Sequence, residues 1–274
     1  MSSRPEVVGP PELFYDETES KKYTTNSHIV QIQSEMAERA LELLALPEDQ
    51  PSILLDVGCG SGLSGEVLTE NEHHWIGIDI SRHMLKVAKE DNESDGDLIL
   101  KDIGTGIPIR PGVIDGAISI SAIQWLCHAN SNKENPRKRL LFFFQSLYAC
   151  LARGARAVFQ FYPQNAAQSE LITEQATKAG FNGGLVVDFP NSTKAKKIYL
   201  VLMTGGIQNL PKALTDENES RSRVEVIDRR NHGNMSSRNL KGSRSYIEAK
   251  KERLRRKGRD VKPTTKYTGR KRRH

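Results

Sequence analysis

Ile53-Leu54-Leu55-Asp56-Val57-Gly58-Cys59-Gly60-Ser61-Gly62 is the stretch that decides the fold of this chain. An apolar run ends in an acid, and a loop with glycine at every second position follows. Buried parallel strands have such unbroken apolar runs, because both of their faces are covered. Residues 63–68 then read as the start of a helix whose first N–H groups can point at a ligand. The stretch therefore predicts a strand, a ligand-binding glycine loop and a helix.

The glycine spacing distinguishes between two kinds of nucleotide site. A dinucleotide fingerprint, G-x-G-x-x-G, would need its third glycine where this chain has Leu63. The third glycine falls one place earlier, and Asp56 would repel a pyrophosphate in the same small space. An acid suits a ligand with an ammonium group, such as the methionine end of S-adenosylmethionine. The motif resembles the first motif of the class I methyltransferases, which implies that Asp56, Gly58 and Gly60 bind this cofactor.

Composition divides the chain into an acidic body and a basic tail. Only 37% of the 274 residues are hydrophobic, a low share for a wholly globular chain. Residues 205–274 hold 21 Lys and Arg against 8 Asp and Glu, whereas residues 1–204 are net acidic. We expect three parts: an N-terminal segment and helix beside the cofactor site (1–50), a core (51–204) and a basic tail (205–274).

Several classes of protein do not fit this composition. No apolar run is long enough to span a membrane, and the N-terminus lacks a signal pattern. Three scattered cysteines form neither a disulfide framework nor a self-contained zinc site. We therefore expect a soluble intracellular protein with no membrane partner and no metal.

The next predicted strand, residues 75–80, also ends in an acid. Asp79 stands 21 positions after Gly58, close to the roughly 20 expected for an acid that holds ribose hydroxyls. Its two oxygens suit the 2′- and 3′-OH, and its neighbour Ile80 completes this part of the expected cofactor site. A helix-capping or solvated Asp79 is the alternative.

Residues 97–103 read as a third strand with a closing acid. In the class I methyltransferases that this chain resembles, the residue at this place contacts the adenine edge. The resemblance implies that Asp102 accepts from the adenine amine and that the Ile103 N–H donates. Three predicted strands that each end in Asp at these spacings are not expected to arise by chance, which favours the cofactor-site interpretation.

An aromatic cluster around Tyr15 comes before a long amphipathic helix, residues 29–44. Such a leading segment can lie across a cofactor mouth, with Tyr15 against the adenosine or the methionine. An aromatic anchor that only fixes the helix to the body is an equally good interpretation.

The methyl acceptor should lie where the fourth and fifth strands end, since ligands of open α/β sheets bind outside the carboxyl ends of strands. Residues 115–120 and 155–161 are these predicted strands. The acceptor pocket is therefore predicted to contain Ser121, Gln124, Trp125 and Tyr162. Trp125 suits either stacking on a base or a place in the core.

The end of the core distinguishes between fold families. Helices are predicted at 136–151, with Gly154 as the residue past its end, and at 169–179. Strands at 185–189 and 198–203 are joined by a loop too short for a crossover helix, so they must be antiparallel. We therefore predict an α/β fold: the Rossmann-like, seven-stranded class I methyltransferase sheet with an antiparallel last strand.

Longer stretches resemble one family, the small-subunit (18S) rRNA guanine-N7 methyltransferases of eukaryotes. The stretches that carry the resemblance are Pro-Pro-Glu-Leu-Phe-Tyr-Asp-Glu (10–17), Leu-Leu-Asp-Val-Gly-Cys-Gly-Ser-Gly-Leu-Ser-Gly (54–65), Ser-Ile-Ser-Ala-Ile-Gln-Trp-Leu (119–126), Gln-Ala-Thr-Lys-Ala-Gly-Phe (175–181), Asp-Phe-Pro-Asn-Ser (188–192), Lys-Lys-Glu-Arg (250–253) and Tyr-Thr-Gly-Arg-Lys-Arg (267–272).

The resemblance implies N7-methylation of a guanine in small-subunit rRNA, during ribosome biogenesis in the nucleus and possibly also in the cytoplasm. Guanine N7 has its own lone pair, so no catalytic base is expected and catalysis is positioning. Two alternatives stay open: an assembly factor whose methyl transfer is secondary, and a class I methyltransferase that acts on tRNA or protein.

The resemblance also implies a heterodimer with the small zinc-binding activator subunit shared by several methyltransferases. In the class I strand order, residues 97–101 lie at the sheet edge, where their apolar centre can pair with a partner strand. A covering loop is the alternative. We expect Ile99→Pro to prevent that pairing.

The tail should combine disorder with basic contact surfaces. Residues 210–234 are polar and expected to be disordered, residues 245–257 read as a basic helix, and residues 269–274 form a basic run. RNA contact and nuclear import are both open as its role.

Overall fold

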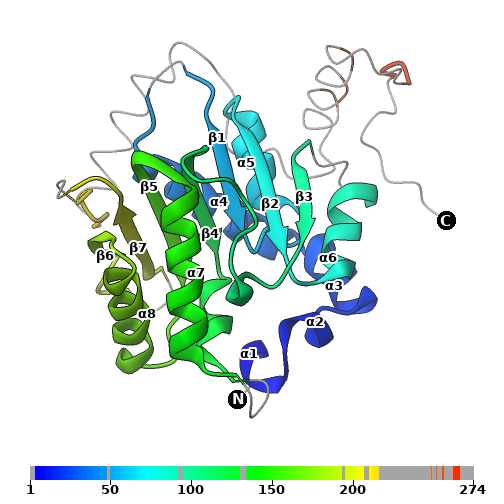
Figure 1. Cartoon of the computed structure of the whole chain (residues 1–274). Helices are drawn as coiled ribbons and strands as arrows, with labels where there is room; N and C mark the ends of the chain where they lie inside the picture. The colour runs from blue at the N-terminus through cyan, green and yellow to red at the C-terminus, as the bar shows by residue number, and fades with distance from the viewer. Residues whose placement is uncertain are drawn as a thin grey trace. The chain divides into compact units, whose positions relative to one another are not determined.

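A computed structural model describes residues 4–47, 50–91, 95–129, 134–192, 195–206 and 210–215, together with residues 248, 251, 255 and 262–265. One mixed sheet forms its centre, in the order β3-β2-β1-β4-β5-β7-β6 (Figure 1). The strands are β1 (Ile53–Val57), β2 (His74–Asp79), β3 (Asp97–Leu100), β4 (Ile114–Ile120), β5 (Leu151–Phe161), β6 (Asn182–Asp188) and β7 (Lys197–Met203).

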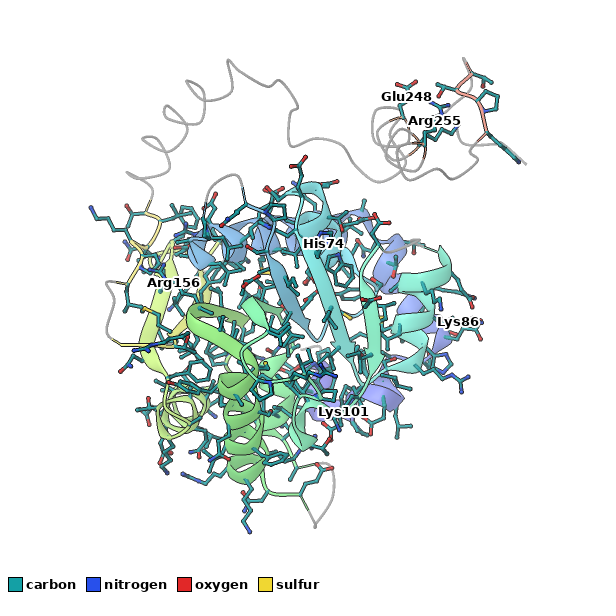
Figure 2. The ribbon with its side chains drawn as sticks, turned by 45° about the horizontal axis from the view of Figure 1, so that its top comes forward. His74, Lys86, Lys101, Arg156, Glu248 and Arg255 are labelled. Atoms are coloured by element: carbon teal, nitrogen blue, oxygen red, sulfur yellow. The ribbon has the colours of Figure 1, made fainter. Side chains whose placement is uncertain are left out.

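Helices cover both faces of this sheet. α4 (Ser27–Leu44), α5 (Leu63–Glu70) and α6 (Arg82–Lys86) lie on one face, and α7 (Pro136–Cys150) and α8 (Ala166–Lys178) lie on the other (Figure 1). Three short helices precede α4: α1 (Pro5–Val8), α2 (Pro11–Phe14) and α3 (Glu17–Thr25). Lys86 on α6 and Arg156 on the inner strand β5 lie on opposite sides of the sheet-containing body in Figure 2.

The core consists of two layers because neighbouring strand residues face opposite ways. Leu54 packs with α4 and α5, whereas Leu55 packs with the phenylalanines of α7. Both leucines are fully buried. The unbroken apolar run of β1 is therefore explained by a strand covered on both faces.

The predicted antiparallel end of the sheet is confirmed. β7 pairs antiparallel with both β5 and β6, whereas β1 to β5 pair in parallel. The predicted α/β class I architecture is thus the observed one.

The prediction for Gly154 was wrong. α7 ends at Cys150, and β5 begins at Leu151, so Gly154 lies inside a strand with φ 86°. The register between β4 and β5 shifts at this place, between the pairs of Ile114 and Gly116. Gly154 therefore serves an irregularity of the strand, where a positive φ is needed.

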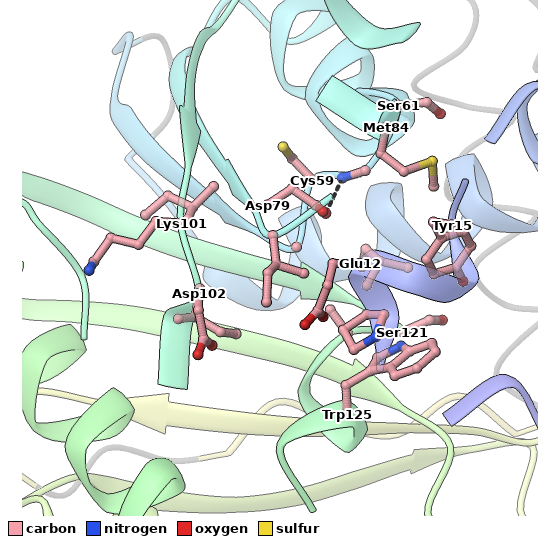
Figure 3. Close-up of a pocket in the computed structure, with 18 of the residues that line it drawn as sticks. Glu12, Tyr15, Cys59, Ser61, Asp79, Met84, Lys101, Asp102, Ser121 and Trp125 are labelled. Carbon is pink, nitrogen blue, oxygen red and sulfur yellow. Dashed lines mark hydrogen bonds between the residues drawn. The ribbon is translucent and has the colours of Figure 1, made fainter. Parts of the chain in front are cut away.

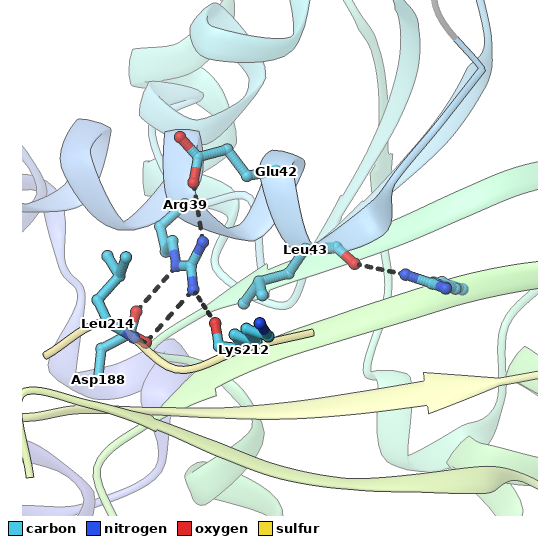
Figure 4. Close-up of polar contacts among 7 residues, drawn as sticks. Arg39, Glu42, Leu43, Asp188, Lys212 and Leu214 are labelled. Atoms are coloured by element: carbon cyan, nitrogen blue, oxygen red, sulfur yellow. Dashed lines mark hydrogen bonds and ion pairs between the residues drawn. The ribbon is translucent and has the colours of Figure 1, made fainter. Parts of the chain in front are cut away.

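Residues 210–215 also differ from the prediction of disorder, because they are fastened to the body. Arg39 of α4 bonds both Asp188 (Nε to Oδ2, 2.9 Å) and the Lys212 carbonyl (Nη2, 3.0 Å), as Figure 4 shows. The Leu214 N–H donates to Asp188 Oδ1 at 2.7 Å, and the Leu214 carbonyl accepts from the Phe189 N–H at 2.8 Å.

The remainder of the tail lies mostly outside the described residues, and this holds for residues 216–234 and 269–274. Residues 219–274 form a second unit, separate from residues 1–218. Within the predicted basic helix, Glu248, Lys251 and Arg255 are described, and they are helical.

Candidate cofactor and acceptor site

A pocket opens at the carboxyl ends of β1, β2, β3 and β4, where the sequence predicts ligand binding. The space between its lining atoms is about 1040 Å³, its open mouth included. Its lining contains these predicted site residues: Tyr15, Gly58, Gly60, Asp79, Ile80, Asp102, Ile103, Ser121 and Trp125 (Figure 3). Three predicted residues, Asp56, Gln124 and Tyr162, are not part of the lining.

The glycine loop wraps around the end of β2. Gly58, Gly60 and Gly62 have φ of 71°, 53° and 84°, all in the left-handed region that favours glycine. The Gly58 N–H donates to the Ile78 carbonyl at 2.7 Å. A Cβ on Gly58 would overlap the Cβ of Ala122, so the loop and the end of β4 meet at a distance that only glycine allows.

Asp56 lies behind this loop and is fully buried. Its Oδ2 accepts from the Ser64 hydroxyl at 2.6 Å, while Oδ1 has no partner among the described residues. Burial raises the pKa of Asp56 to about 7, with Asp79 adding to the rise and the Ser64 bond opposing it. A buried carboxylate oxygen without a donor is a place for a cationic or N–H donor group.

Asp79 is half-buried and holds the pocket wall together. Its Oδ2 accepts from the Gly60 N–H at 2.9 Å, and its Oδ1 accepts from the Ser81 N–H at 2.7 Å. Burial raises its pKa, whereas the bonds from the backbone N–H groups lower it. The helix α6 is capped by Ser81, whose hydroxyl accepts from the Met84 N–H, and not by Asp79. The Asp79 carboxylate lines the pocket, next to Ile80.

Asp102 is paired within the protein by a residue that sequence reasoning missed. Arg139 of α7 places Nη2 2.8 and 2.9 Å from the two Asp102 oxygens, and its Nη1 lies 2.7 Å from Oε2 of Glu134. The Gly104 N–H also donates to Asp102 Oδ1 at 2.8 Å. Arg139 stands 37 positions after Asp102 on another element, and no motif or spacing in the sequence connects the two.

The N-terminal segment forms part of the pocket wall, as one of the two interpretations of Tyr15 predicts. The Ser81 hydroxyl donates to the Tyr15 carbonyl at 2.9 Å, and the Tyr15 ring lies 5.9 Å from that of Trp125 and 5.9 Å from that of Tyr23. Burial, with Asp79 nearby, raises the pKa of Tyr15 to about 12. The ring therefore stays neutral.

The predicted acceptor residues separate into two groups. Ser121 has φ 58°, which is strained for a residue other than glycine, and its hydroxyl donates to Gln160 Oε1 at 2.8 Å. It lines the pocket together with the half-buried Trp125. Gln124 is buried and donates to the Ser121 carbonyl at 3.0 Å, so it supports this turn from inside.

Tyr162 lies at the end of β5, outside the lining residues. Its carbonyl accepts from Arg4 Nη1 at 2.9 Å, and its ring carries the Lys197 ammonium 5.4 Å from the centroid. It therefore belongs to the surface beside the pocket rather than to the pocket itself.

The described residues contain no group of three or more His, Cys, Asp and Glu that suits a metal ion. None of the described helices is long and apolar enough to cross a membrane.

Solved structures and family models agree on the class. Haemonchus contortus phosphoethanolamine N-methyltransferase 2, solved in complex with S-adenosyl-L-methionine, matches with a TM-score of 0.53 at 17% identity, over 70% of this chain and 58% of that one. A family model described as "Methyltransferase domain" matches residues 55–159. The sheet order, the strand-end acids and the glycine loop are those of a class I S-adenosylmethionine-dependent methyltransferase.

Similarity over the whole length identifies the family within that class. The 18S rRNA (guanine-N(7))-methyltransferase of Mus musculus is 56% identical, over 99% of this chain and 97% of that protein. The 18S rRNA (guanine(1575)-N(7))-methyltransferase of Saccharomyces cerevisiae is 48% identical, over 99% of each. A model described as "Methyltransferase involved in Williams-Beuren syndrome" matches residues 202–274. The chain belongs to the 18S rRNA (guanine-N7)-methyltransferase family.

Proposed function

We propose that this chain transfers a methyl group from S-adenosylmethionine to N7 of a guanine in 18S rRNA, in the nucleus or nucleolus. The observation that carries the proposal is a pocket with acids at the ends of β2 and β3, in a chain that matches named 18S rRNA methyltransferases over almost its full length. The structural neighbour supports the fold alone.

The pocket residues fit this cofactor. The positive φ of Gly58 and Gly60 lets the backbone approach the ligand closely. Asp56 is buried behind this loop and outside the pocket lining, so it would act on the ammonium end from behind the loop rather than as part of the pocket wall. Asp79 and Ile80 suit the ribose, and the region around Asp102 and Ile103 suits the adenine. Bound there, the cofactor would supply an electrophilic methyl group on a sulfonium centre.

The proposed contact of Asp102 with the adenine amine has to be reconciled with its contact to Arg139. Arg139 already donates to both of its oxygens, so the carboxylate is held in one orientation. An adenine amine would have to share these oxygens with Arg139. Carboxylate oxygens have the acceptor capacity for both, because each has more than one lone pair.

The proposed reaction needs no general base, although carboxylates such as Glu12 line the pocket. The lining residues include no histidine, and burial raises the pKa of Cys59 well above its usual range, so its thiol stays protonated. Tyr15 is neutral as well. Guanine N7 attacks with its own lone pair and carries no proton to remove, so the chain needs only to align N7 and to exclude water.

Cations beside the pocket suit the RNA around the target base. Arg4 and Lys197 both contact Tyr162 at the end of β5, and Lys196 precedes Lys197 at the same edge of the sheet. Lys and Arg side chains bind phosphates without reading sequence. We assign this surface, together with residues 205–274, to RNA contact; import is the second role for the tail.

The activator subunit is the partner proposed for β3. β3 stands at the edge of the sheet, and among the described residues no strand pairs with its outer side. The Lys101 N–H donates to the Asp79 carbonyl at 2.9 Å. Because alternate residues of a strand face the same neighbour, Ile99 also faces β2, and the outer groups belong to Leu98 and Leu100. Ile99→Pro would therefore break the internal ladder, so it does not test the partner.

Mapping N7-methylguanosine in 18S rRNA tests the function. Cells that lack this protein should lose one N7-methylguanosine, and the wild-type gene should restore it. Gly58→Ala, which changes the glycine loop, should not restore the mark. If Gly58→Ala supports ribosome assembly without the mark, then the physical presence of the protein is the essential role. A mark that persists without the protein rules out the proposed activity and favours tRNA or protein as the substrate.

A further inference from the structure

One acid of the pocket has no role in the cofactor assignments. The acidic lining residues are Glu12, Asp79, Asp102 and Glu134. Asp79 is held by backbone N–H groups, and Asp102 and Glu134 share Arg139. Among the described contacts, the Glu12 carboxylate alone has neither a hydrogen bond nor an ion pair. Figure 3 shows it projecting into the pocket between Asp102 and Trp125.

Glu12 stands on a firmly held segment rather than on a free terminus. Its helix α2 begins after Pro10 with a second proline at its first position. The Tyr15 N–H donates to the Pro11 carbonyl at 2.9 Å, and Ser81 fixes the carbonyl of Tyr15. Because prolines restrict the backbone and Tyr15 is anchored, the backbone of Glu12 is fixed at the pocket, and its exposed side chain can turn to meet a ligand.

The pocket also offers a surface for a flat ring. Trp125 and Tyr15 line the same space as Glu12, with ring centroids 5.9 Å apart and planes inclined at 57°. Enzymes that modify a base usually take it out of the stack, place it against aromatic side chains and read its Watson–Crick edge by hydrogen bonds. A carboxylate beside two aromatic rings has the chemistry for that reading.

We propose that Glu12 selects guanine by accepting from its N1–H and N2–H groups. Guanine alone among the common bases presents two adjacent donors on this edge, and the two oxygens of one carboxylate accept both. N7 lies on the opposite edge of the purine, so a base held in this way keeps its nucleophile free. This assignment rests on the function proposed above and adds to it the residue that chooses the base.

Removing the N2 amine of the target base tests whether Glu12 accepts hydrogen bonds from guanine. The substrate is small-subunit rRNA ligated to carry guanosine or inosine at the mapped position; inosine lacks the N2 amine. The full-length wild-type protein should prefer guanosine by about tenfold or more in kcat/KM, because one charge-assisted hydrogen bond is lost. Glu12→Gln should lower kcat/KM on guanosine about tenfold and bring the guanosine-to-inosine ratio close to one, since its NH₂ group faces a donor.

Two measurements separate base selection from other roles. Glu12→Gln should bind S-adenosylmethionine with wild-type affinity in calorimetric titration. Glu17→Gln, a neighbouring exposed acid that pairs with Lys21 outside the pocket, should leave both the affinity and the ratio unchanged. A Glu12→Gln variant with weakened cofactor binding and an unaltered ratio overturns the proposal and makes Glu12 a cofactor ligand. A wild-type protein that methylates no guanine instead overturns the proposed function.

Discussion

At the scale of single residues, two glycines with the same φ allow the cost of backbone strain to be measured separately from the effect on cofactor binding. Gly58 and Gly112 both have φ 71°, but a Cβ on Gly58 would overlap Ala122, whereas a Cβ on Gly112 would meet nothing within 4 Å. Gly112→Ala should cost only about 1–2 kcal/mol of stability, the penalty for a left-handed residue. Gly58→Ala should in addition displace the glycine loop and weaken S-adenosylmethionine binding at least tenfold.

Calorimetric titration and thermal unfolding of the two variants check this prediction. Equal cofactor affinity in Gly58→Ala and Gly112→Ala would show that the loop does not hold the cofactor. Loss of binding in both variants would show that the effect is one of stability.

Asp56 gives a prediction about pH. Its folded pKa of about 7 lies above the roughly 3.9 of an unfolded Asp, so the folded protein keeps this proton longer. The stabilisation that results is fully present below about pH 4 and is lost as the pH rises towards 7. The isosteric variant Asp56→Asn has no such proton to lose.

The melting temperature of the wild-type protein relative to Asp56→Asn should therefore fall between pH 4.5 and 7.5 and level off above that. Thermal unfolding at half-unit pH steps measures the difference. Parallel curves would mean that Asp56 is ionised in the folded protein throughout this range.

At the scale of elements, strands were easier to predict from the sequence than the contacts between elements. β1 and β2 are mainly apolar runs with an Asp at or next to their last residue, a local signal, and the short loop before β7 required an antiparallel pair. Gly154 misled because a glycine after a helix usually ends it, whereas here β5 had already begun. The local sequence pattern does not show whether a glycine with positive φ ends a helix or lies at an irregularity inside the next strand.

The site shows the same division. Residues at the strand ends were predictable because parallel strands bring their carboxyl ends to one edge. Arg139 and Glu12 were not predicted as site residues, since each enters from another element, and their spacing to the motifs carries no signal. The hydrogen bonds of Arg39 to Asp188 and to the Lys212 carbonyl were also not predicted, because these residues lie far apart in the sequence.

Edge strand β3 gives the prediction that belongs to this scale. Leu100 is 56% exposed and turns its backbone N–H away from β2, and a proline is tolerated where the N–H faces outward. Leu100→Pro should thus leave the fold intact and abolish co-purification with the zinc-binding activator subunit. Leu100→Ala keeps the N–H and should retain the partner. Size-exclusion chromatography after co-expression decides, and a partner retained by both variants would place its contact away from this edge.

At the scale of the whole molecule, the charge division separates two tasks. The cofactor site lies within residues 1–218, which form one unit and are net acidic, while residues 219–274 form another with 20 Lys and Arg against 6 Asp and Glu. Cofactor affinity should therefore depend on the first unit alone, and RNA affinity on both.

Deleting residues 244–274 tests that division. Each Lys or Arg that contacts a phosphate releases counterions, so the logarithm of RNA affinity falls with the logarithm of salt concentration by roughly 0.7–0.9 per contact. The deletion should reduce the magnitude of this slope by the equivalent of several phosphate contacts, while the affinity for S-adenosylmethionine stays at the wild-type value. Filter binding of 18S rRNA between low and physiological salt measures the slope, and a scrambled-sequence tail of equal charge serves as control. If the scrambled tail restores the slope, the contacts are electrostatic and non-specific; an unaltered slope on deletion would leave nuclear import as the role of the tail.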